Sequence, residues 1–283
     1  MKKIIGIFII IMLATVMLSA IFTNVKGNIE ITTMVDTPVW EIGDTWTYNE
    51  HISTFAYNDD GVRYYAYYQN ITSLYTIKDD TGDAYTLELT ADNYEGSFSQ
   101  GIFKFKFTPY MKYSQVYEHR KTDLAVVSVL TQEKGLVIWK LGEIGIPIPT
   151  HYNSINDITY TPPEELIPFP LSEGKTGTFP SFTGVGHDKF SLYFGLINLY
   201  DSDVSYEYEA LDYTCEKEII TVPAGAFESY NISSIYPNEY NYAYVYYVPE
   251  VGFITKWSEH WADDSGKTLL DYELELISNT YKP

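Results

Sequence analysis

Cysteine and basic residues are scarce in this sequence. Cys215 is the only cysteine among 283 residues, so no disulfide can form within the chain and the fold must be held by its core. We expect Cys215 itself to be a small buried residue rather than a nucleophile. Lysine and arginine number 18 against 38 acidic residues, which gives a formal net charge of -20. Because an acidic surface repels nucleic acid, we expect no nucleic-acid partner.

Motifs of catalysis and metal binding are also missing. The chain has no G-x-S-x-G element, no P-loop lysine and no dinucleotide-binding glycine pattern. The acidic clusters at 79–83 and 201–203 do not match an EF-hand calcium loop. The histidines are far apart and show no zinc-binding spacing: His51, His119, His151, His187 and His260. We therefore predict no catalytic residues, no metal and no cofactor. A hydrolase built on two carboxylates is the less favoured alternative.

Helical spacing of apolar residues is nearly absent after the first 27 residues. Apolar and polar residues instead alternate with a period of two, which is typical of strands with one buried face. The clearest examples are 85–90, 103–107, 206–209 and 270–276. Turn sequences ending in glycine separate such runs, because glycine adopts the left-handed conformation that closes a hairpin. The pattern predicts an all-β antiparallel protein with at most a minor helix.

Tyrosine is abundant, with 28 copies, and aromatic residues make up 17% of the chain. Tyrosine suits half-buried strands because its ring packs while its hydroxyl stays hydrated. The runs at 64–68 and 240–247 fit two interpretations: ordinary strand residues, or a stacking platform for a flat ligand such as a sugar.

The N-terminus carries an export signal. Lys2 and Lys3 precede residues 4–22, which are uncharged. We interpret residues 1–27 as a signal peptide, cleaved after Ala20 or Gly27, or as an N-terminal anchor through residues 4–22. Removing residues 1–27 deletes three lysines and moves the formal charge from -20 to -23. We expect an extracellular or cell-surface location, with membrane contact only through this segment.

The mature chain divides into two predicted units. Residues 36–143 form a first antiparallel β unit, residues 144–170 a proline-rich linker or crossover, and residues 171–283 a second antiparallel β unit. The segment 172–179, "SEGKTGTF", echoes 41–48, "EIGDTWTY". This weak repeat suggests that the two units are related.

Short motifs give the chain a family resemblance. "GDTWTY", "VPAGAFESYNI" and "YYVPEVGFITKW" resemble a group of exported archaeal and bacterial proteins with G-x-x-W-x-Y, V-P-A-G-T-F and P-x-V-G motifs. Ala226 stands where threonine is usual. The resemblance implies a strongly curved antiparallel sheet or half-barrel, similar to the periplasmic lipoprotein-carrier fold. It implies no catalytic residues.

Two local features complete the candidate sites. In "VPAGAF", Pro223 fits the second position of a type I turn and Gly225 fits the left-handed bulge position after it, which predicts a structural hairpin with a bulge. Asn70 and Asn231 begin N-x-[ST] triplets and are candidate glycosylation sites. We favour Asn231, because Ser229 and Ser233 share its strand face.

The sequence does not name a reaction, and it leaves the ligand-binding residues and the oligomeric state unknown. We expect an exported, non-catalytic cell-surface or secreted β protein that binds an apolar or aromatic-stacking ligand, a lipid or a glycan. The alternative is a structural or assembly component of the cell envelope, in which case the partner is another envelope component.

Overall fold

The computed structural model describes residues 34–283, apart from 59, 101–102, 142–147 and 193–196. The predicted signal peptide at 1–27 and the anchor at 4–22 lie outside the described residues. Within the described part, the chain is all β and contains no helix. The predicted fold class, an all-β protein with a curved antiparallel sheet, is confirmed.

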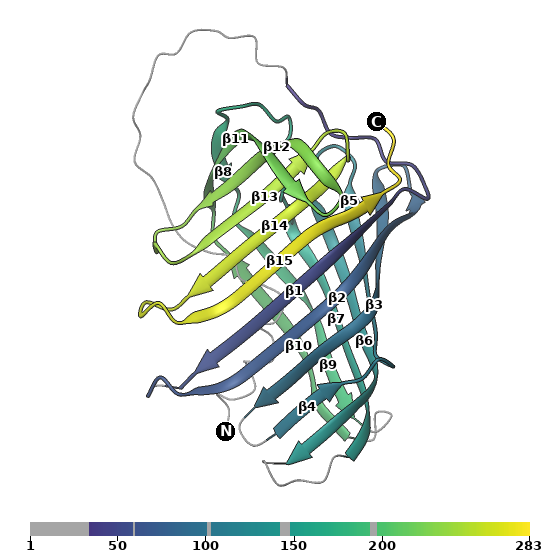
Figure 1. Ribbon diagram of the computed structural model, residues 1–283, viewed down its shortest axis with the longest axis vertical. Helices are drawn as coiled ribbons and strands as arrows, with labels where there is room; N and C mark the ends of the chain where they lie inside the picture. Colours follow the sequence, from purple (N-terminus) through teal and green to yellow (C-terminus); the bar gives the residue numbers. More distant parts are fainter. Residues whose placement is uncertain (1–33, 59, 101–102, 142–147, 193–196) are drawn as a thin grey trace.

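Fifteen strands join into one sheet in the described part of the chain (Figure 1). They are β1 (Thr45–Tyr57), β2 (Arg63–Asp80), β3 (Ala84–Gln100), β4 (Phe103–Phe107), β5 (Lys112–Arg120), β6 (Val126–Leu141), β7 (Ile148–Glu164), β8 (Thr176–Phe179), β9 (Phe182–Leu192), β10 (Ile197–Tyr208), β11 (Leu211–Val222), β12 (Gly225–Ile235), β13 (Tyr242–Val248), β14 (Phe253–Ala262) and β15 (Thr268–Asn279).

The strands follow the order β10-β9-β7-β6-β4-β3-β2-β1-β15-β14-β13-β12-β11-β8. β4 and β5 lie end to end, and each pairs with β3 on one side and with β6 on the other. Together with β3 and β6 they close a partial ring within the sheet. In Figure 1 the strands β11 to β15 and β1 to β3 form a front layer, and β6, β7, β9 and β10 pass behind it. The curvature gives the sheet a concave inner side and a convex outer side.

The sheet does not divide at the predicted linker. Residues 148–164, within the segment expected to be a linker or crossover, form β7, which pairs with β6 on one side and β9 on the other. The prolines of 144–170 suggested an irregular segment. Pro162 and Pro163 lie opposite the irregularity between Val126 and Ser128 of β6, where a missing N–H costs no ladder bond.

The two predicted units are joined a second time. β1 belongs to the first unit and β15 to the second, yet they pair over Trp46–Thr54. β9 and β10, from the second unit, extend the sheet on the side of the first. The units therefore form one continuous sheet rather than two separate ones.

The repeated segments share a backbone arrangement. Gly43 N donates to Ile77 O and Ile77 N to Asp44 O, while Gly174 N donates to Cys215 O and Cys215 N to Lys175 O. Both glycines have positive φ, +97° and +75°, a conformation that glycine adopts without steric cost. The likeness is local, because β1 is a long central strand and β8 is a short edge strand.

The inner side of the sheet is strongly aromatic. Trp46 and Tyr48 both point inward and are 0% exposed, as the alternation in the opening motif suggests. They belong to a buried cluster with Trp40 and Phe253, whose ring centroids lie 5.2 Å apart. Cys215 is also fully buried there, and burial raises the pKa of its thiol to about 11. That thiol therefore stays protonated at neutral pH.

Candidate functional site

The concave side carries carboxyl groups among its aromatic rings. Glu50 follows Trp46 and Tyr48 on the inward phase of β1, because alternate residues of a strand share one face. Glu259 lies on β14 opposite Tyr272 of β15. Glu133 on β6 and Glu164 at the end of β7 complete the set. We call these four residues the inner carboxyls.

Glu50 is held by two hydroxyl groups of β2. Ser73 Oγ donates to Glu50 Oε1, and Tyr75 Oη donates to the same oxygen at 3.1 Å. These bonds favour the charged form, but burial outweighs them and raises the pKa of Glu50 to about 7. Glu50 is therefore partly protonated near neutral pH.

Glu133 and Glu259 show the same competition between burial and hydrogen bonding. Tyr152 Oη donates to Glu133 Oε2 at 2.6 Å, and burial raises the pKa of Glu133 to about 7. Trp261 Nε1 donates to Glu259 Oε1 at 2.7 Å, and Glu259 is 8% exposed. Burial, with a further contribution from the negative charge of Glu164, raises the pKa of Glu259 to about 8.

Burial raises the pKa of Glu164 to about 7, and, unlike in the other three, no hydrogen bond from the described residues acts in the opposite direction. Glu50 and Glu164 both keep part of their surface accessible to water although much protein surrounds them.

Some tyrosines are influenced by inner carboxyls from different strands of the curved sheet. Burial, and then the negative charges of Glu50 and Glu164, raise the pKa of Tyr117 on β5. Burial and the charges of neighbouring groups, including Glu164 and Glu259, raise the pKa of Tyr208 on β10. Many strands separate β10 from β14 in the sheet order. Tyr208 and Glu259 therefore interact only because the curvature of the sheet brings these two strands face to face.

Several buried polar atoms have no hydrogen-bond partner within the described part of the chain. Those on the inward side include Thr54 Oγ1, Tyr65 Oη, Gln69 Nε2, Asn156 Oδ1 and Tyr208 Oη. Leaving a buried polar atom unpaired costs about 1–3 kcal/mol, so native proteins rarely keep several without a use. The concave side thus holds both donors and acceptors whose hydrogen-bonding capacity the described residues leave unused.

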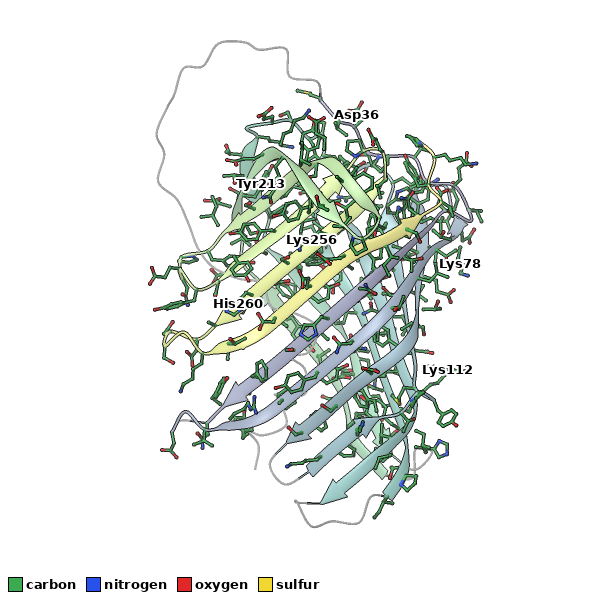
Figure 2. The ribbon with its side chains drawn as sticks, viewed as in Figure 1. Asp36, Lys78, Lys112, Tyr213, Lys256 and His260 are labelled. Carbon is green, nitrogen blue, oxygen red and sulfur yellow. The ribbon has the colours of Figure 1, made fainter. Side chains whose placement is uncertain are left out.

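Three of the inner carboxyls have no oppositely charged partner in the described part of the chain. No lysine or arginine of the described residues forms an ion pair with Glu50, Glu164 or Glu259, and none contributes to their pKa shifts. Basic side chains pair instead on the outer side, where Lys256 Nζ lies 2.7 Å from Glu275 Oε1. Figure 2 shows Lys256 and His260 along β14 in the front layer.

Metal and membrane features can be assessed only in the described part of the chain. No cluster of three or more histidine, cysteine, aspartate or glutamate side chains there is arranged to hold a metal ion. The same residues include no helix with the length and apolar character needed to span a bilayer.

A surface pocket of about 470 Å³ lies between the β1–β2 and β14–β15 turns. Asp263 lines it, but its Oδ1 already accepts hydrogen bonds from Ser265 N and Lys267 N. Because its charged group is satisfied locally, this pocket is a weaker candidate than the concave side.

The predicted turn residues lie in the β11–β12 hairpin. Val222 pairs with Gly225, so Pro223 and Ala224 form a two-residue loop. Gly225 has φ +144°, and the pairing runs through it without a register shift, so the bulge expected at Gly225 is not formed. Ala224 N donates to Leu276 O at 3.1 Å, which ties the turn to β15. These contacts are all structural.

The two glycosylation triplets differ in their surroundings. Asn70 is exposed on β2, and its Oδ1 lies 2.6 Å from His51 Nδ1. Asn231 Nδ2, the atom that a glycan would modify, donates to Glu218 Oε1 at 2.6 Å. Ser229, which we expected beside Asn231 on a polar face, is 0% exposed. Accessibility therefore favours Asn70.

The histidines and the tyrosine runs are divided between the two sides of the sheet. His119 is buried against Trp40, and burial lowers its pKa to about 4, so it stays neutral. Tyr65 and Tyr67 point inward, whereas Tyr242 stacks on His260 at 5.4 Å and is partly exposed. Neither run forms a single platform.

Comparison with known proteins gives no relative. No family model, no curated protein and no solved structure matches the chain.

The inner carboxyls are not among the residues predicted from the sequence, although the sequence shows their strand phase. Glu50 continues the inward series of Trp46 and Tyr48, and Glu259 lies between Trp257 and Trp261 at intervals of two. An acidic residue on the apolar phase of a strand is the signal that could have identified them.

Proposed function

We propose that this protein is an exported, non-catalytic binding protein whose concave side takes a polar, ring-bearing ligand of the glycan class. The observation that carries the proposal is the set of buried polar atoms on that side that have no hydrogen-bond partner among the described residues. A glycan supplies hydroxyl groups that donate and accept at such atoms, and its ring faces stack on aromatic side chains.

A glycan fits this surface better than a lipid does. A lipid chain offers nothing to hydrogen-bond, so it would leave Tyr65 Oη, Gln69 Nε2 and Asn156 Oδ1 unpaired. It would also desolvate Glu50 and Glu164 further without compensation. The export proposal rests on residues 1–27, and the envelope-component alternative rests on the free edges of β8 and β10.

A hydrolase is the second candidate, and one observation favours it. Burial raises the pKa of both Glu164 and Glu259, and the negative charge of Glu164 contributes to the shift of Glu259. Glycoside hydrolysis uses two carboxyl groups of which one is protonated and the other ionised. Release of reducing sugar from a bound oligosaccharide, abolished in Glu164→Gln, would favour this candidate over simple binding.

The test is calorimetric titration with neutral oligosaccharides and, separately, with fatty acids. We expect an oligosaccharide to bind and Tyr65→Phe to weaken it about three- to tenfold, the value of one hydrogen bond. Tyr68→Phe on the outer side of the same strand is the matched control and should leave affinity unchanged. Binding of fatty acids alone would contradict the proposal, and a stable oligomer that binds neither would favour the envelope alternative.

A further inference from the structure

We infer that the outer side of the sheet carries a second binding site, for a carboxylated glycan, around Lys106, Tyr110, Lys112 and Lys134. We call these four residues the lysine patch. They belong to β4, β5, β6 and the turn between β4 and β5. The patch lies on the opposite face from the concave side, so the inference goes beyond the proposed function and does not depend on it.

Two lysines face each other directly across the β5–β6 ladder. Lys112 pairs with Lys134, and both are exposed. They lie on the outer side because Glu133, the neighbour of Lys134, is buried on the inner side and successive side chains of a strand alternate. Figure 2 shows Lys112 at the right-hand margin of the molecule. Like charges directly opposite each other repel, so this pair does not stabilise the fold.

Lys106 continues the positive charge onto β4. It is exposed and pairs with Ile138, which follows Lys134 on the same phase of β6, about 13 Å further along the strand. On the same ladder Lys104 pairs with Lys140. The register thus gathers on adjoining strands lysines that are well separated in the sequence.

The lysines of the patch have no acidic partner in the part of the chain that the structure describes. Elsewhere on the sheet lysines do have one: Lys78 Nζ lies 3.0 Å from Glu88 Oε2, and Lys189 Nζ lies 2.7 Å from Asp201 Oδ2. Acidic residues outnumber basic ones by 38 to 18, so an acidic neighbour is easily found. Unpaired lysines gathered in such a chain indicate a surface that receives negative charge from a partner.

Tyr110 adds an exposed aromatic ring beside these lysines. It is 75% exposed and lies in the turn between β4 and β5. Thr108 Oγ1 donates to Leu136 O at 2.6 Å, and a Cβ atom on Gly135 would lie 2.4 Å from Tyr110 O. Glycine permits this close backbone approach, so the turn packs on β6 next to Lys134.

The combination fits an acidic sugar chain. Lysine ammonium groups bind carboxylates, and an exposed tyrosine ring stacks on the face of a sugar. The residues that adjoin the lysines on the outer phase are uncharged and can bond sugar hydroxyls. On β5 and β6, Ser114 pairs with Gln132, and on β7 Asn153 pairs with Lys134.

A narrow polymer fits better than a membrane does. A broad anionic surface would also approach the acidic residues that dominate the chain and be repelled by them, since exposed charges act over about 8 Å at physiological salt. A single glycan chain can contact the patch alone.

The experiment titrates a hexamer of galacturonic acid, and its fully methyl-esterified form, into the full chain at pH 7.5 by calorimetry. The two have the same rings, but only the first carries carboxylates. We expect the acid form to bind at least about tenfold more tightly, the combined effect of several exposed ion pairs. Its affinity should fall between about 50 and about 200 mM NaCl, because salt screens exposed charges.

Substitutions separate the patch from general charge effects. Lys112→Gln and Lys134→Gln should each weaken binding about two- to fivefold, the value of one exposed ion pair. Lys78→Gln removes the same charge from a lysine already paired with Glu88, so it should leave the affinity unchanged. Lys134→Gln also relieves the repulsion with Lys112, so its melting temperature should not fall.

The aromatic part of the site has its own variant. Tyr110→Ala should weaken binding about two- to tenfold, the value of one stacking contact. Tyr240→Ala, at another exposed ring, is the matched control and should bind like the unmodified chain. Tyr65→Phe on the concave side should also have no effect, which keeps this test separate from that of the proposed function.

Four outcomes would overturn the inference. They are no binding of the acid form, equal binding of the acid and ester forms, equal affinities in Lys134→Gln and Lys78→Gln, and tighter binding of phosphatidylserine vesicles or a single-stranded oligonucleotide than of the hexamer. Each leaves the concave side as a site for a neutral glycan, which the neutral-oligosaccharide titration decides.

Discussion

The indole Nε1 of Trp46 donates a hydrogen bond of 2.8 Å to the backbone carbonyl of Val251, 205 residues further along the chain. Trp40 Nε1 donates in the same way to the Gly252 carbonyl at 2.8 Å, and Tyr48 Oη to the Ile254 carbonyl at 2.6 Å. Aromatic side chains before and within β1 therefore hold the β13–β14 turn. The G-x-x-W-x-Y and P-x-V-G motifs thus form one structural unit.

Replacing Trp46 by phenylalanine should destabilise the fold. The change removes the donor to Val251 and part of a fully buried ring. We expect the free energy of unfolding to fall by about 1–3 kcal/mol, the cost of leaving a buried acceptor unpaired, with a further loss from the cavity. Urea denaturation measures this. Tyr240→Phe, on an exposed ring, should change stability by less than about 0.5 kcal/mol, and an equal loss in both variants would contradict the role of Trp46.

Stability should fall as pH rises from 6.5 to 8. Burial raises the pKa of Glu50, Glu133 and Glu164 to about 7 and that of Glu259 to about 8, from an ordinary value of 4.5. In this window the folded chain binds protons that the unfolded chain has already lost, so the unfolding free energy decreases with pH. His119 acts in the opposite direction, but only between its folded pKa of about 4 and its ordinary 6.5.

Thermal unfolding at pH 6.5 and 8 measures this dependence. We expect a lower melting temperature at pH 8, and a smaller difference in Glu50→Gln because the amide cannot titrate. Glu275→Gln, on the outer side beside Lys256, should keep the full pH dependence. A melting temperature that rises from pH 6.5 to 8 would be incompatible with buried, protonated inner carboxyls.

Valine at position 225 should strain the β11–β12 hairpin. Gly225 has φ +144°, which side-chain-bearing residues rarely adopt, although the space around it is open, with Phe227 no closer than 3.6 Å. The cost is therefore backbone strain, about 1–3 kcal/mol. Ala226→Val is the matched control, since Ala226 is an exposed strand residue. Equal melting temperatures for the two variants would show that the turn does not require glycine.

Alanine at position 186 should disturb the pairing of β7 with β9. A Cβ atom on Gly186 would lie 1.8 Å from the Asp157 carbonyl oxygen and 2.9 Å from Ile158 Cα, so the backbones would have to separate. We expect a loss of about 1–3 kcal/mol, typical of overpacking, together with faster amide exchange in β9. Val185→Ala, at an exposed neighbour, should leave exchange unchanged, and the same protection in both variants would argue against close strand contact.

A host that glycosylates N-x-[ST] triplets should modify Asn70 in preference to Asn231. Asn70 is exposed, whereas Asn231 Nδ2 already donates to Glu218. Mass spectrometry should show that Asn70→Gln removes a glycan and Asn231→Gln does not. Glu218→Ala should raise modification at Asn231 if its hydrogen bond is the obstacle. Modification of Asn231 alone in the wild-type chain would contradict this order.

Local patterns predicted the strands but not their pairing. Leu270, Leu274 and Leu276 are buried on β15, as the alternation at 270–276 indicated, because a period of two is a local property of the chain. That β15 pairs with β1 depends on contacts between residues more than 200 positions apart, and no local pattern encodes it. β7 was missed because its prolines suggested a linker.

The candidate site was predictable only in part. The strand phase of Glu50 and Glu259 is a property of the sequence alone, and it is enough to mark both as inward residues. Which carboxyls meet is decided by the curvature, since Glu164 and Glu259 are brought together from distant parts of the sheet. The surroundings of a buried carboxyl, and hence its protonation, follow from that long-range geometry and not from neighbouring residues.

The last strand of the chain, β15, occupies the middle of the sheet between β1 and β14. During synthesis, the edges of β1 and β14 that face β15 stay unpaired until residues 268–279 have been made. The ladder between β1 and β15 therefore cannot form before these residues have been made, and its formation closes a very long loop. A chain truncated before residue 268 should consequently stay incompletely folded and aggregate through those open edges.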